Sequence, residues 1–584
     1  MLDRRQALRL AALGGVAPLA HANAMKPRVG GDVGSDPNNP IVRLTPFITP
    51  LPIPPSPPPG DPFRPSDLAA QNLAFLGPVA GRAQFTTIVE EEAMISLHPE
   101  LPKTPVWRYR STNMPEDSPF LAGPTFVVRQ GTPQVVRFIN DLPANHVGFG
   151  VPHTTTHFHG GHIPPVFDGF PENVPDLPHI VREHGESFDY VWPQQDVGFT
   201  TGNPDRDERP ALQWYHDHLL DFTGPNVMRG MAGLYIVFDG LDTGDETRGL
   251  RLPSGPFDIP LVLQDKRMAP DGTMIYQPDD FDGFLGDQML VNGAIYPFLE
   301  VKRRKYRFRL LNGSNARMYK VRITDENNRN PKPLHVIGND GGLLSRTCRK
   351  RRTAFLGMAE RLEVIVDFSR FPEGTELYLT NFIKQDSGRG PDGDSEDVDE
   401  VPKDQAVKLM KFIVTGGEVR DRSVIPDTLR PIRPVPQDMI DNAVHRHFKF
   451  ERTGGAWAIN GEFIDIEHPS ARPKKGQPEI WHIENGGGGW WHPIHVHIEL
   501  GRVLSRNGQR PGPLERDGNA KKDTVNLAGG DEAQVYFNFR DFTGPTVFHC
   551  HNIEHEDHFM MARFDIEENT QSTPSAPDPR MNRR

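Results

Sequence analysis

His549, Cys550 and His551 form one short run near the end of the chain, and His555 and Met560 follow shortly after it. Successive side chains of a β-strand point to opposite faces of its sheet. If the run is extended, both histidines of the run therefore face one side and Cys550 faces the other. A thiolate, two imidazoles and a weak axial methionine make an electron-transfer copper site. The run thus predicts a copper site on the cysteine side and a second metal centre on the histidine side.

Three further histidine pairs share the i, i+2 spacing, namely His157 and His159, His216 and His218, and His495 and His497. Strand alternation places both members of a pair on one face, so the four pairs offer eight imidazoles to a cluster. A lone pair is more often a satisfied polar feature of a surface strand, but four pairs, one enclosing a cysteine, are poorly explained that way. Structural zinc needs only four ligands, so it does not account for two ligand sets.

Five motifs occur in chain order, HFHGGHIPPVFDGFP, WYHDH, GNDGGLL, HPIHVHIELGRVL and HCHNIEHEDHFMM. With these motifs the sequence resembles the three-domain multicopper oxidases of the spore-coat laccase and bilirubin oxidase group. The resemblance runs from about Pro40 to about Ile566. Two features depart from the group: His558 lies inside the axial loop, and HVHIE stands where many laccases have a glycine after the last histidine.

The resemblance implies four copper ions, one of type 1, one of type 2 and a type 3 pair. It implies that the type 1 ion is held by His492, Cys550, His555 and the axial Met560. It implies that the type 2 ion is held by His157 and His495. For the type 3 pair it implies the ligands His159, His216, His218, His497, His549 and His551.

The implied reaction is divided between two sites. The type 1 site takes single electrons from an outer donor, Cys550 passes them along the backbone, and four electrons reduce O₂ to two waters at the cluster. Because this reduction consumes protons, acidic groups are expected beside the cluster. Asp168, nine residues after His159, and Glu556, directly after His555, match the positions of the group's acids. Their plainer roles are a turn-forming aspartate before glycine and a partner that orients a histidine.

Short strands bounded by glycine and proline turns recur throughout the 584 residues, and long helical periodicity is scarce. This pattern predicts an all-β protein made of sandwiches, and the length predicts two to four domains. A strand–turn–strand unit that starts at Gly123 recurs from Asn292 and from Asn460, which predicts three similar sandwiches. The resemblance implies that these are cupredoxin-like Greek-key domains.

The expected segments are an export signal at 1–24, a proline-rich strap at 25–66, cupredoxin domains at 67–250, 251–420 and 421–571, and a tail at 572–584. The ligand motifs fall in the first and third domains, so the middle domain is expected to act as a spacer. It carries an acidic run at 386–400, for which we expect a solvated insertion. The alternative is a lid or a cation-attracting loop near the substrate face.

The N-terminus has the features of an export signal. Arg4 and Arg5 precede an apolar stretch that is too short to span a bilayer, and A-x-A sites follow it. The twin arginine predicts the export route for folded proteins, and hence a periplasmic or secreted protein without a membrane span.

A net charge of −12 argues against nucleic-acid binding. Of the two cysteines, Cys348 is expected to be a small buried side chain without a disulfide partner, and we expect a monomer.

These observations predict a laccase-like oxidase of phenols, aromatic amines or tetrapyrroles with O₂ as the acceptor. The alternative is a metallo-oxidase that acts on Mn(II), Fe(II) or Cu(I). The 16 methionines are scattered, which argues against a cuprous oxidase with a methionine-rich insertion. The acidic run offers the hard oxygen ligands that Mn(II) or Fe(II) would need. A copper-free relative would have lost ligands, whereas this chain retains the whole set.

Overall fold

The computed structural model describes residues 42–60, 62–277, 281–394, 397–417 and 419–569. The predicted export signal and C-terminal tail lie outside these ranges. Within them, six β-sheets follow one another along the chain as three pairs, and the helices are few and short. This confirms the predicted all-β class with three cupredoxin-like sandwiches. No helix in the described ranges is long and apolar enough to cross a membrane.

The first sandwich holds both histidine pairs of the N-terminal half. One of its sheets has the strand order β2 (Thr104–Ser111), β1 (Gln84–Ile95), β4 (Gln134–Asp141) and β6 (Ser187–Trp192). The other has the order β3 (Gly123–Arg129), β8 (Ala232–Phe238), β7 (Leu212–Asp217) and β5 (Thr156–His159).

The middle sandwich has the largest apolar core. Its first sheet has the order β12 (Ala294–Ile295), β11 (Gln288–Val291), β9 (Asp258–Met268), β14 (Lys305–Asn312), β19 (Arg361–Asp367), β16 (Leu334–Asn339) and β17 (Gly342–Arg351), with β10 (Met274–Ile275) paired to β9. Its second sheet has the order β13 (Phe298–Lys302), β21 (Val407–Thr415), β20 (Glu376–Asn381), β15 (Tyr319–Thr324) and β18 (Ala354–Leu356).

The third sandwich holds the remaining histidine pairs and Cys550. One sheet has the order β23 (Ala456–Ile459), β22 (Val444–Thr453), β24 (Glu479–Asn485), β28 (Glu532–Phe537) and β26 (Arg502–Arg506). The other has the order β27 (Thr524–Leu527), β25 (His492–Val496), β29 (Gly544–Cys550) and β30 (Met561–Ile566). Strand β29 is buried over nearly its whole length.

The described α-helices are α2 (Asp67–Phe75), α3 (Thr223–Arg229), α4 (Gln437–Asp441) and α5 (Ile553–Asp557). Short 3₁₀ turns are η1 (Gly77–Arg82), η2 (Pro165–Phe167), η3 (Phe199–Thr201), η4 (Arg206–Glu208) and η5 (Gly255–Phe257). Helix α5 follows β29 directly and lies against α3 of the first sandwich.

The repeated sequence unit ends in an asparagine that makes the same set of hydrogen bonds in all three sandwiches. Asn140, Asn312 and Asn485 are fully or almost fully buried. The side-chain amide of each donates to two backbone carbonyls, and its oxygen accepts from a backbone N–H two residues further on. One buried amide thus satisfies backbone groups that would otherwise be unpaired where the strand leaves the sheet.

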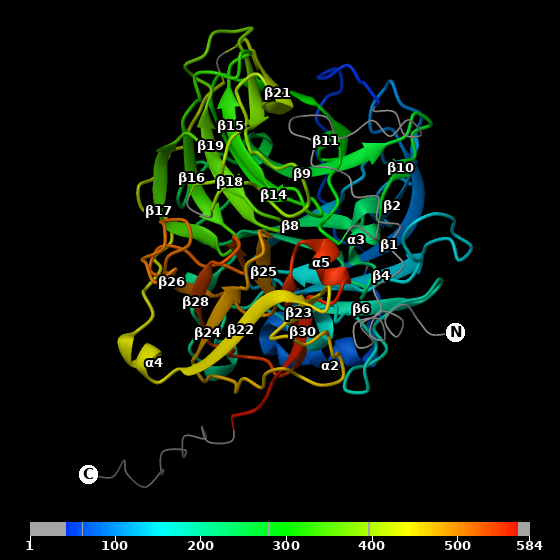
Figure 1. Ribbon diagram of the computed structural model, residues 1–584, viewed down its shortest axis with the longest axis vertical. Helices are drawn as coiled ribbons and strands as arrows, with labels where there is room; N and C mark the ends of the chain where they lie inside the picture. Colours follow the sequence, from blue (N-terminus) through cyan, green and yellow to red (C-terminus); the bar gives the residue numbers. More distant parts are fainter. Residues whose placement is uncertain (1–41, 61, 278–280, 395–396, 418, 570–584) are drawn as a thin grey trace.

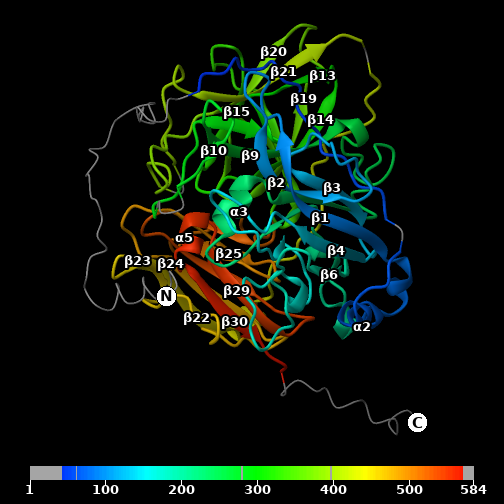
Figure 2. The ribbon, with the colours of Figure 1, turned by 90° about the vertical axis from the view of Figure 1, so that its right-hand side faces the viewer.

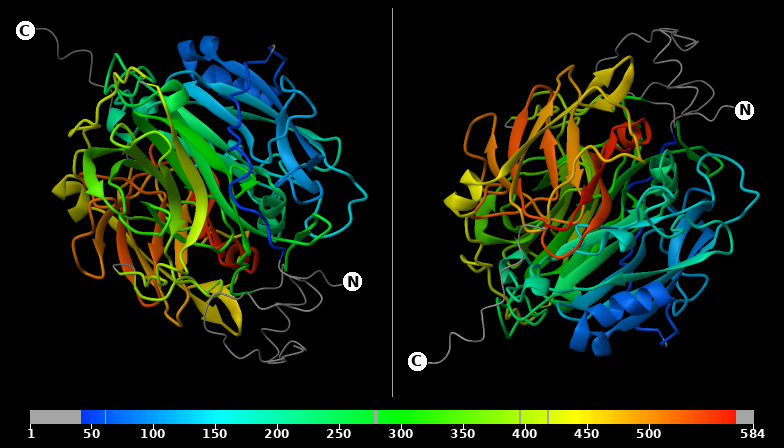
Figure 3. Two further views of the ribbon diagram at one scale, coloured as in Figure 1. Left: turned by 90° about the horizontal axis from the view of Figure 1, so that it is seen from above. Right: turned by 90° about the horizontal axis from the view of Figure 1, so that it is seen from below.

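The first and third sandwiches lie side by side, and the middle sandwich covers both (Figure 1). Figure 2 shows α3 and α5 at the junction, and the view from below in Figure 3 shows the third sandwich facing the first. Polar contacts cross this junction: the Asp541 carboxylate of the third sandwich accepts from the backbone of Gly198 and Thr200 in the first. The ligand-bearing strands of both sandwiches end at this junction.

The described part of the proline-rich segment lies across two sandwiches. Leu51 is buried in the middle core and its N–H donates to the Phe298 carbonyl at 2.7 Å. Further along, the Pro55 carbonyl accepts from Thr125 of the first sandwich. The boundaries proposed at 250/251 and 420/421 both fall between strands, and we retain them as proposals.

Candidate metal centres

The first centre forms at β25 and β29 of the third sandwich, with His555 supplied by α5. The Cys550 Sγ lies 3.4 Å from His492 Nδ1 and 3.6 Å from His555 Nδ1, and the two nitrogens are 3.2 Å apart. Met560 is buried in the same apolar cluster as Cys550. Its N–H donates to the His555 carbonyl and its carbonyl accepts from the Cys550 N–H, each at 3.0 Å. One sulfur and two nitrogens therefore face a common point, with a thioether residue tethered beside them.

The eight paired imidazoles lie together at the junction of the first and third sandwiches. They come from the ends of β5, β7, β25 and β29, two strands from each sandwich. Antiparallel registers place His157 opposite His216 and His495 opposite His549. All eight are buried. Since each sandwich supplies half of the rings, neither sandwich contains the cluster alone.

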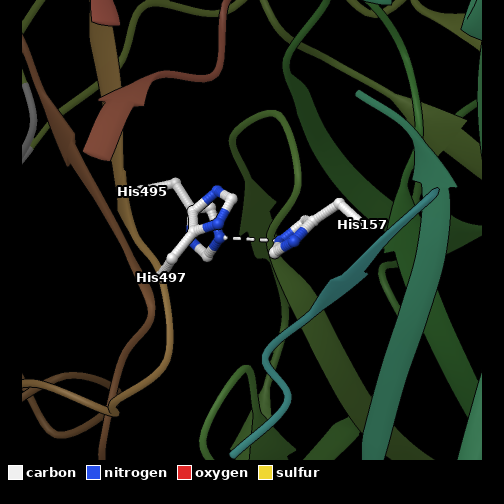
Figure 4. A group of neighbouring side chains, drawn as sticks. All are labelled: His157, His495 and His497. Carbon is white, nitrogen blue, oxygen red and sulfur yellow. Dashed lines mark hydrogen bonds between the residues drawn. The ribbon is translucent and has the colours of Figure 1, made fainter. Parts of the chain in front are cut away.

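His157 and His495 form a pair across the junction. The His157 Nε2 lies 3.3 Å from the His495 Nε2, and Figure 4 shows His157 pointing toward His495 and His497 of the third sandwich. The rings of His157 and His497 are stacked with their centroids 3.8 Å apart.

The other six imidazoles divide into His218, His497 and His549, whose ring nitrogens converge, and His159, His216 and His551, whose rings are neighbours. In the first group the His549 Nε2 lies 3.2 Å from the Nε2 of both neighbours. In the second group the ring centroids are 5.2 to 5.8 Å apart.

Burial lowers the pKa of several ligand imidazoles in both centres. Burial lowers the pKa of His492 to about 3, and burial together with neighbouring histidines lowers the pKa of His216 and His551 far below its ordinary value. Among the described residues, the His216 Nε2 and both ring nitrogens of His551 have no hydrogen-bond partner. Converging, unpaired lone pairs are costly in a buried site, and a bound cation removes that cost. A donor set of imidazoles and one thiolate suits copper, so these residues fit copper ions.

Asp168 and Glu556 both lie beside the cluster. The Asp168 carboxylate is 2.7 Å from His497 Nδ1 and 3.1 Å from His157 Nδ1, and burial raises the pKa of this carboxyl. The Glu556 carboxylate lies 2.9 Å from His549 Nδ1 and 3.7 Å from a nitrogen of a second ring, His218. Although Glu556 directly follows His555, its side chain thus turns toward the cluster and away from the first centre.

Two charged residues at the cluster have no counterpart in the sequence analysis. The Asp523 carbonyl accepts from His495 Nδ1 at 2.8 Å, and its carboxylate lies 3.3 Å from His159 Nε2. Arg361, on β19 of the middle sandwich, is fully buried and pairs with that carboxylate through Nη1 at 2.9 Å. The middle sandwich therefore also contributes to the cluster surroundings. Neither residue belongs to a spacing motif, so only the assembled structure reveals them.

Aromatic rings cover the first centre. His555 is fully buried, and the Trp457 ring lies 3.9 Å from the His555 ring, centroid to centroid. The ring of Trp490, which is partly exposed, lies 5.4 Å from Trp457 on the solvent side. Arg452 and Arg389 stand 5.2 and 4.5 Å from the Trp490 ring. A continuous aromatic path therefore leads from the surface to His555.

His558 does not face the common point of the first centre. It is buried, its Nδ1 lies 2.5 Å from the Glu554 carbonyl and its ring lies 4.2 Å from the ring of Phe281.

Cys348, the second cysteine, is half-buried against the middle core and unbridged, and burial raises the pKa of its thiol.

The described acidic side chains of the run at 386–400 are exposed, which agrees with the solvated insertion expected, while hydrogen bonds and ion pairs attach the run to the protein. The carbonyls of Arg389 and Pro391 accept from the backbone and the indole of Trp491, at 2.7 and 2.9 Å. Glu400 is 2.9 Å from Lys320, and Asp392 pairs with Lys384, which lies just before the run in the sequence.

A thiolate–imidazole centre beside an eight-imidazole cluster, in three cupredoxin-like sandwiches, defines a copper oxidoreductase. Residues 430–570 match the multicopper oxidase family. The chain is 33% identical over 529 residues to bilirubin oxidase of Albifimbria verrucaria, covering 89% of this chain and 81% of the relative. It is 31% identical over 531 residues to a laccase of Bacillus subtilis, covering 82% and 93%.

Among solved structures, the McoA multicopper oxidase of Aquifex aeolicus is similar, with 25% identity, a TM-score of 0.68 and coverage of 89% of this chain and 99% of that chain. The chain belongs to the multicopper oxidases. It is a laccase-like, copper-binding oxidoreductase that uses O₂, as the sequence motifs predicted.

Proposed function

We propose that this oxidase takes single electrons from aromatic donors (phenols, aromatic amines or tetrapyrroles) and reduces O₂ to two waters. The observation that carries the proposal is the ring path from Trp490 through Trp457 to His555. A planar donor can stack on the partly exposed Trp490 without touching the buried His555. Relatives named bilirubin oxidase and laccase support the same class of donor.

We assign four copper ions to the twelve predicted ligands. The type 1 ion takes His492, Cys550, His555 and the axial Met560. The type 2 ion takes the facing pair His157 and His495. The type 3 pair takes the two groups of three, His218 with His497 and His549, and His159 with His216 and His551. The support for this division is the contact between His157 and His495, the converging nitrogens of His218, His497 and His549, and the neighbouring rings of His159, His216 and His551.

Bound copper supplies one-electron chemistry at the type 1 centre and O₂ reduction at the cluster. The chain's own residues supply connection, orientation and protons. Cys550 is joined through the backbone to His549 and His551, so one strand links the two centres covalently. The carboxylates of Asp168 and Glu556 each orient a ligand imidazole. Because both carboxylates contact rings of the cluster, each can transfer protons to it.

A metal-ion donor is less well supported by the surroundings of the type 1 centre. A hard cation needs several free carboxylate oxygens. The nearby Asp282 carboxylate already pairs with Arg389 at 3.0 Å and accepts from the Trp490 indole at 2.9 Å. In the acidic run, Asp392 likewise pairs with Lys384, and Glu400 pairs with Lys320 and Arg322.

Steady-state rates of the copper-loaded enzyme, measured side by side, test the choice of donor. We expect a phenol and bilirubin to be oxidised faster than Mn(II), Fe(II) or Cu(I). Faster oxidation of a metal ion than of either aromatic donor would overturn the proposal.

The type 1 assignment has an internal control in the second cysteine. We expect Cys550→Ser to lose the blue thiolate-to-copper absorption and donor oxidation, because only a thiolate gives this charge transfer. Cys348→Ser, a matched change at a thiol far from both centres, should keep both. Metal analysis should give about four coppers per chain. A blue Cys550→Ser protein would disprove the assignment.

We further propose that the enzyme is exported by the twin-arginine route and acts as a monomer in the periplasm or outside the cell. Arg4, Arg5 and the short apolar stretch after them support the route. Replacing Arg4 and Arg5 by lysine should retain the enzyme in the cytoplasm, as measured by cell fractionation.

A further inference from the structure

A fifth His-x-His pair lies on the outer face of the third sandwich. His445 and His447 belong to β22, where Phe448 and Phe450 point into the core and the alternate positions face solvent. The parallel register with β24 places His482 directly opposite His447. Three imidazoles from two neighbouring strands therefore project from the same face of the sheet.

The three rings are in contact with one another. The His445 Nδ1 lies 2.7 Å from the His482 Nε2. The ring of His447 is stacked on the ring of His482 at a centroid distance of 4.3 Å and an angle of 15°. Ligand nitrogens on a tetrahedral ion with bonds of about 2.0–2.1 Å lie roughly 3.3 Å apart. Binding of an ion therefore requires exposed rings, above all that of His447, to rotate from the stacked arrangement, and such rotations occur on the ps–ns timescale.

The electrostatic surroundings favour a cation at this point. Partial burial and the two neighbouring histidines lower the pKa of His482. The ammonium group of Lys449, on the same face of β22, is 3.2 Å from Glu451 and 3.8 Å from Glu484. Glu532, on the neighbouring strand β28, adds negative charge close to His482.

We propose that His445, His447 and His482 form a surface site for a divalent transition-metal ion, separate from the catalytic copper centres. A pair of histidines two apart on a strand, with a third on the adjacent strand, supplies three imidazoles and leaves a fourth position open to water. Imidazole ligands select Cu²⁺, Ni²⁺ and Zn²⁺ over Mg²⁺ or Ca²⁺. Because the rings are at the surface, the ion exchanges with solvent and is removed by mild chelators.

Nickel is a suitable probe, since it reports on this site while the catalytic centres remain filled with copper. The copper-loaded enzyme is titrated with Ni²⁺ alone by calorimetry, and bound nickel is counted after equilibrium dialysis. We expect one Ni²⁺ per chain. Removing a residue that only orients a metal ligand costs about 10–100-fold in metal affinity. His482→Gln removes a ligand itself, so it should weaken nickel binding at least about tenfold.

His468→Gln is the matched control. His468 is also in the third sandwich, is 79% exposed and pairs only with a carboxylate three residues away. This variant should bind nickel like the parent enzyme. All variants should retain the blue absorption and donor oxidation, which separates this inference from the proposed function. Equal nickel affinity in the parent and in His482→Gln, or no stoichiometric binding by the parent, would overturn the proposal.

Discussion

At the scale of single residues, the centres contain buried imidazoles in surroundings that are rare in folded proteins. Both ring nitrogens of His551 are buried and have no hydrogen-bond partner among the described residues. Such nitrogens cost free energy unless a cation binds. The carboxylates of Asp168 and Glu556 fix the outer nitrogens of the same rings, so the inner nitrogens are directed at the metal positions.

Glu556→Gln should separate proton supply from electron supply. The amide keeps the size and much of the hydrogen bonding of the carboxylate but cannot carry a proton. We expect full copper content, normal anaerobic reduction of the type 1 centre by the donor, and O₂ consumption reduced by roughly 10²-fold or more. Stopped-flow reduction and an oxygen electrode measure the two steps. If both steps slow together, or neither does, Asp168 becomes the first candidate.

Met560→Leu should tune the type 1 centre without destroying it. The two histidines and Cys550 hold the ion, and an axial thioether mainly sets its reduction potential. We expect the blue colour to persist and the potential, measured by redox titration, to rise. Loss of the copper from this variant, or an unchanged potential, would indicate that Met560 is not the axial ligand.

At the scale of elements, the turn after η2 connects a carboxylate to a ligand strand. Gly169 follows Asp168 with a φ of +77°, and a Cβ there would overlap the Thr156 carbonyl and approach the His157 N–H on β5. The turn can approach β5 this closely only because Gly169 has no side chain.

Gly169→Ala should therefore disturb the type 2 pair and lower stability. Left-handed backbone costs roughly 1–2 kcal/mol for alanine, and displacement of the turn adds to that cost. We expect a lower melting temperature and a loss of type 2 copper, measured by thermal denaturation and electron paramagnetic resonance. Gly185→Ala is the control: its φ is +84° but no atom lies within 4 Å of the added Cβ, so it should show strain without copper loss.

The elements also show what sequence alone can predict. Alternation along β29 predicted correctly that Cys550 and its two flanking histidines serve different faces, because a strand has a fixed period of two. The repeated unit predicted three sandwiches. By contrast, Asp523, Arg361 and Asp282 reach the centres from loops and from another sandwich. Their positions depend on how the sandwiches dock, and no local periodicity encodes that.

At the scale of the whole molecule, the junction between the outer sandwiches contains a charged group at His162, whose side chain is 12% exposed. Its Nε2 is 2.8 Å from the Asp541 carboxylate and its Nδ1 is 3.2 Å from Glu499, both in the third sandwich. Burial lowers the pKa of His162, but the two carboxylates outweigh it and raise the pKa to about 9. His162 is therefore charged in the folded enzyme at neutral pH.

This pairing predicts a pH-dependent contribution to stability. Because the folded pKa is above the ordinary value of 6.5, the contribution is complete below about pH 6.5 and is lost as the pH rises through about 9. It amounts to at most about 3 kcal/mol. His162→Gln should thus lower the free energy of unfolding at pH 6 more than at pH 10, in denaturant titrations. An equal loss at both pH values would show that the charge of His162 does not stabilise the junction.

The division of the imidazoles between two sandwiches also fixes an order of events in biosynthesis. His157, His159, His216 and His218 are translated more than 250 residues before the rings they face. The cluster therefore cannot take up metal until the third sandwich has been synthesised and docked. We therefore expect copper to bind after the polypeptide is complete. In a cell short of copper, we expect chains to accumulate in which the two outer sandwiches are docked but the cluster holds no copper.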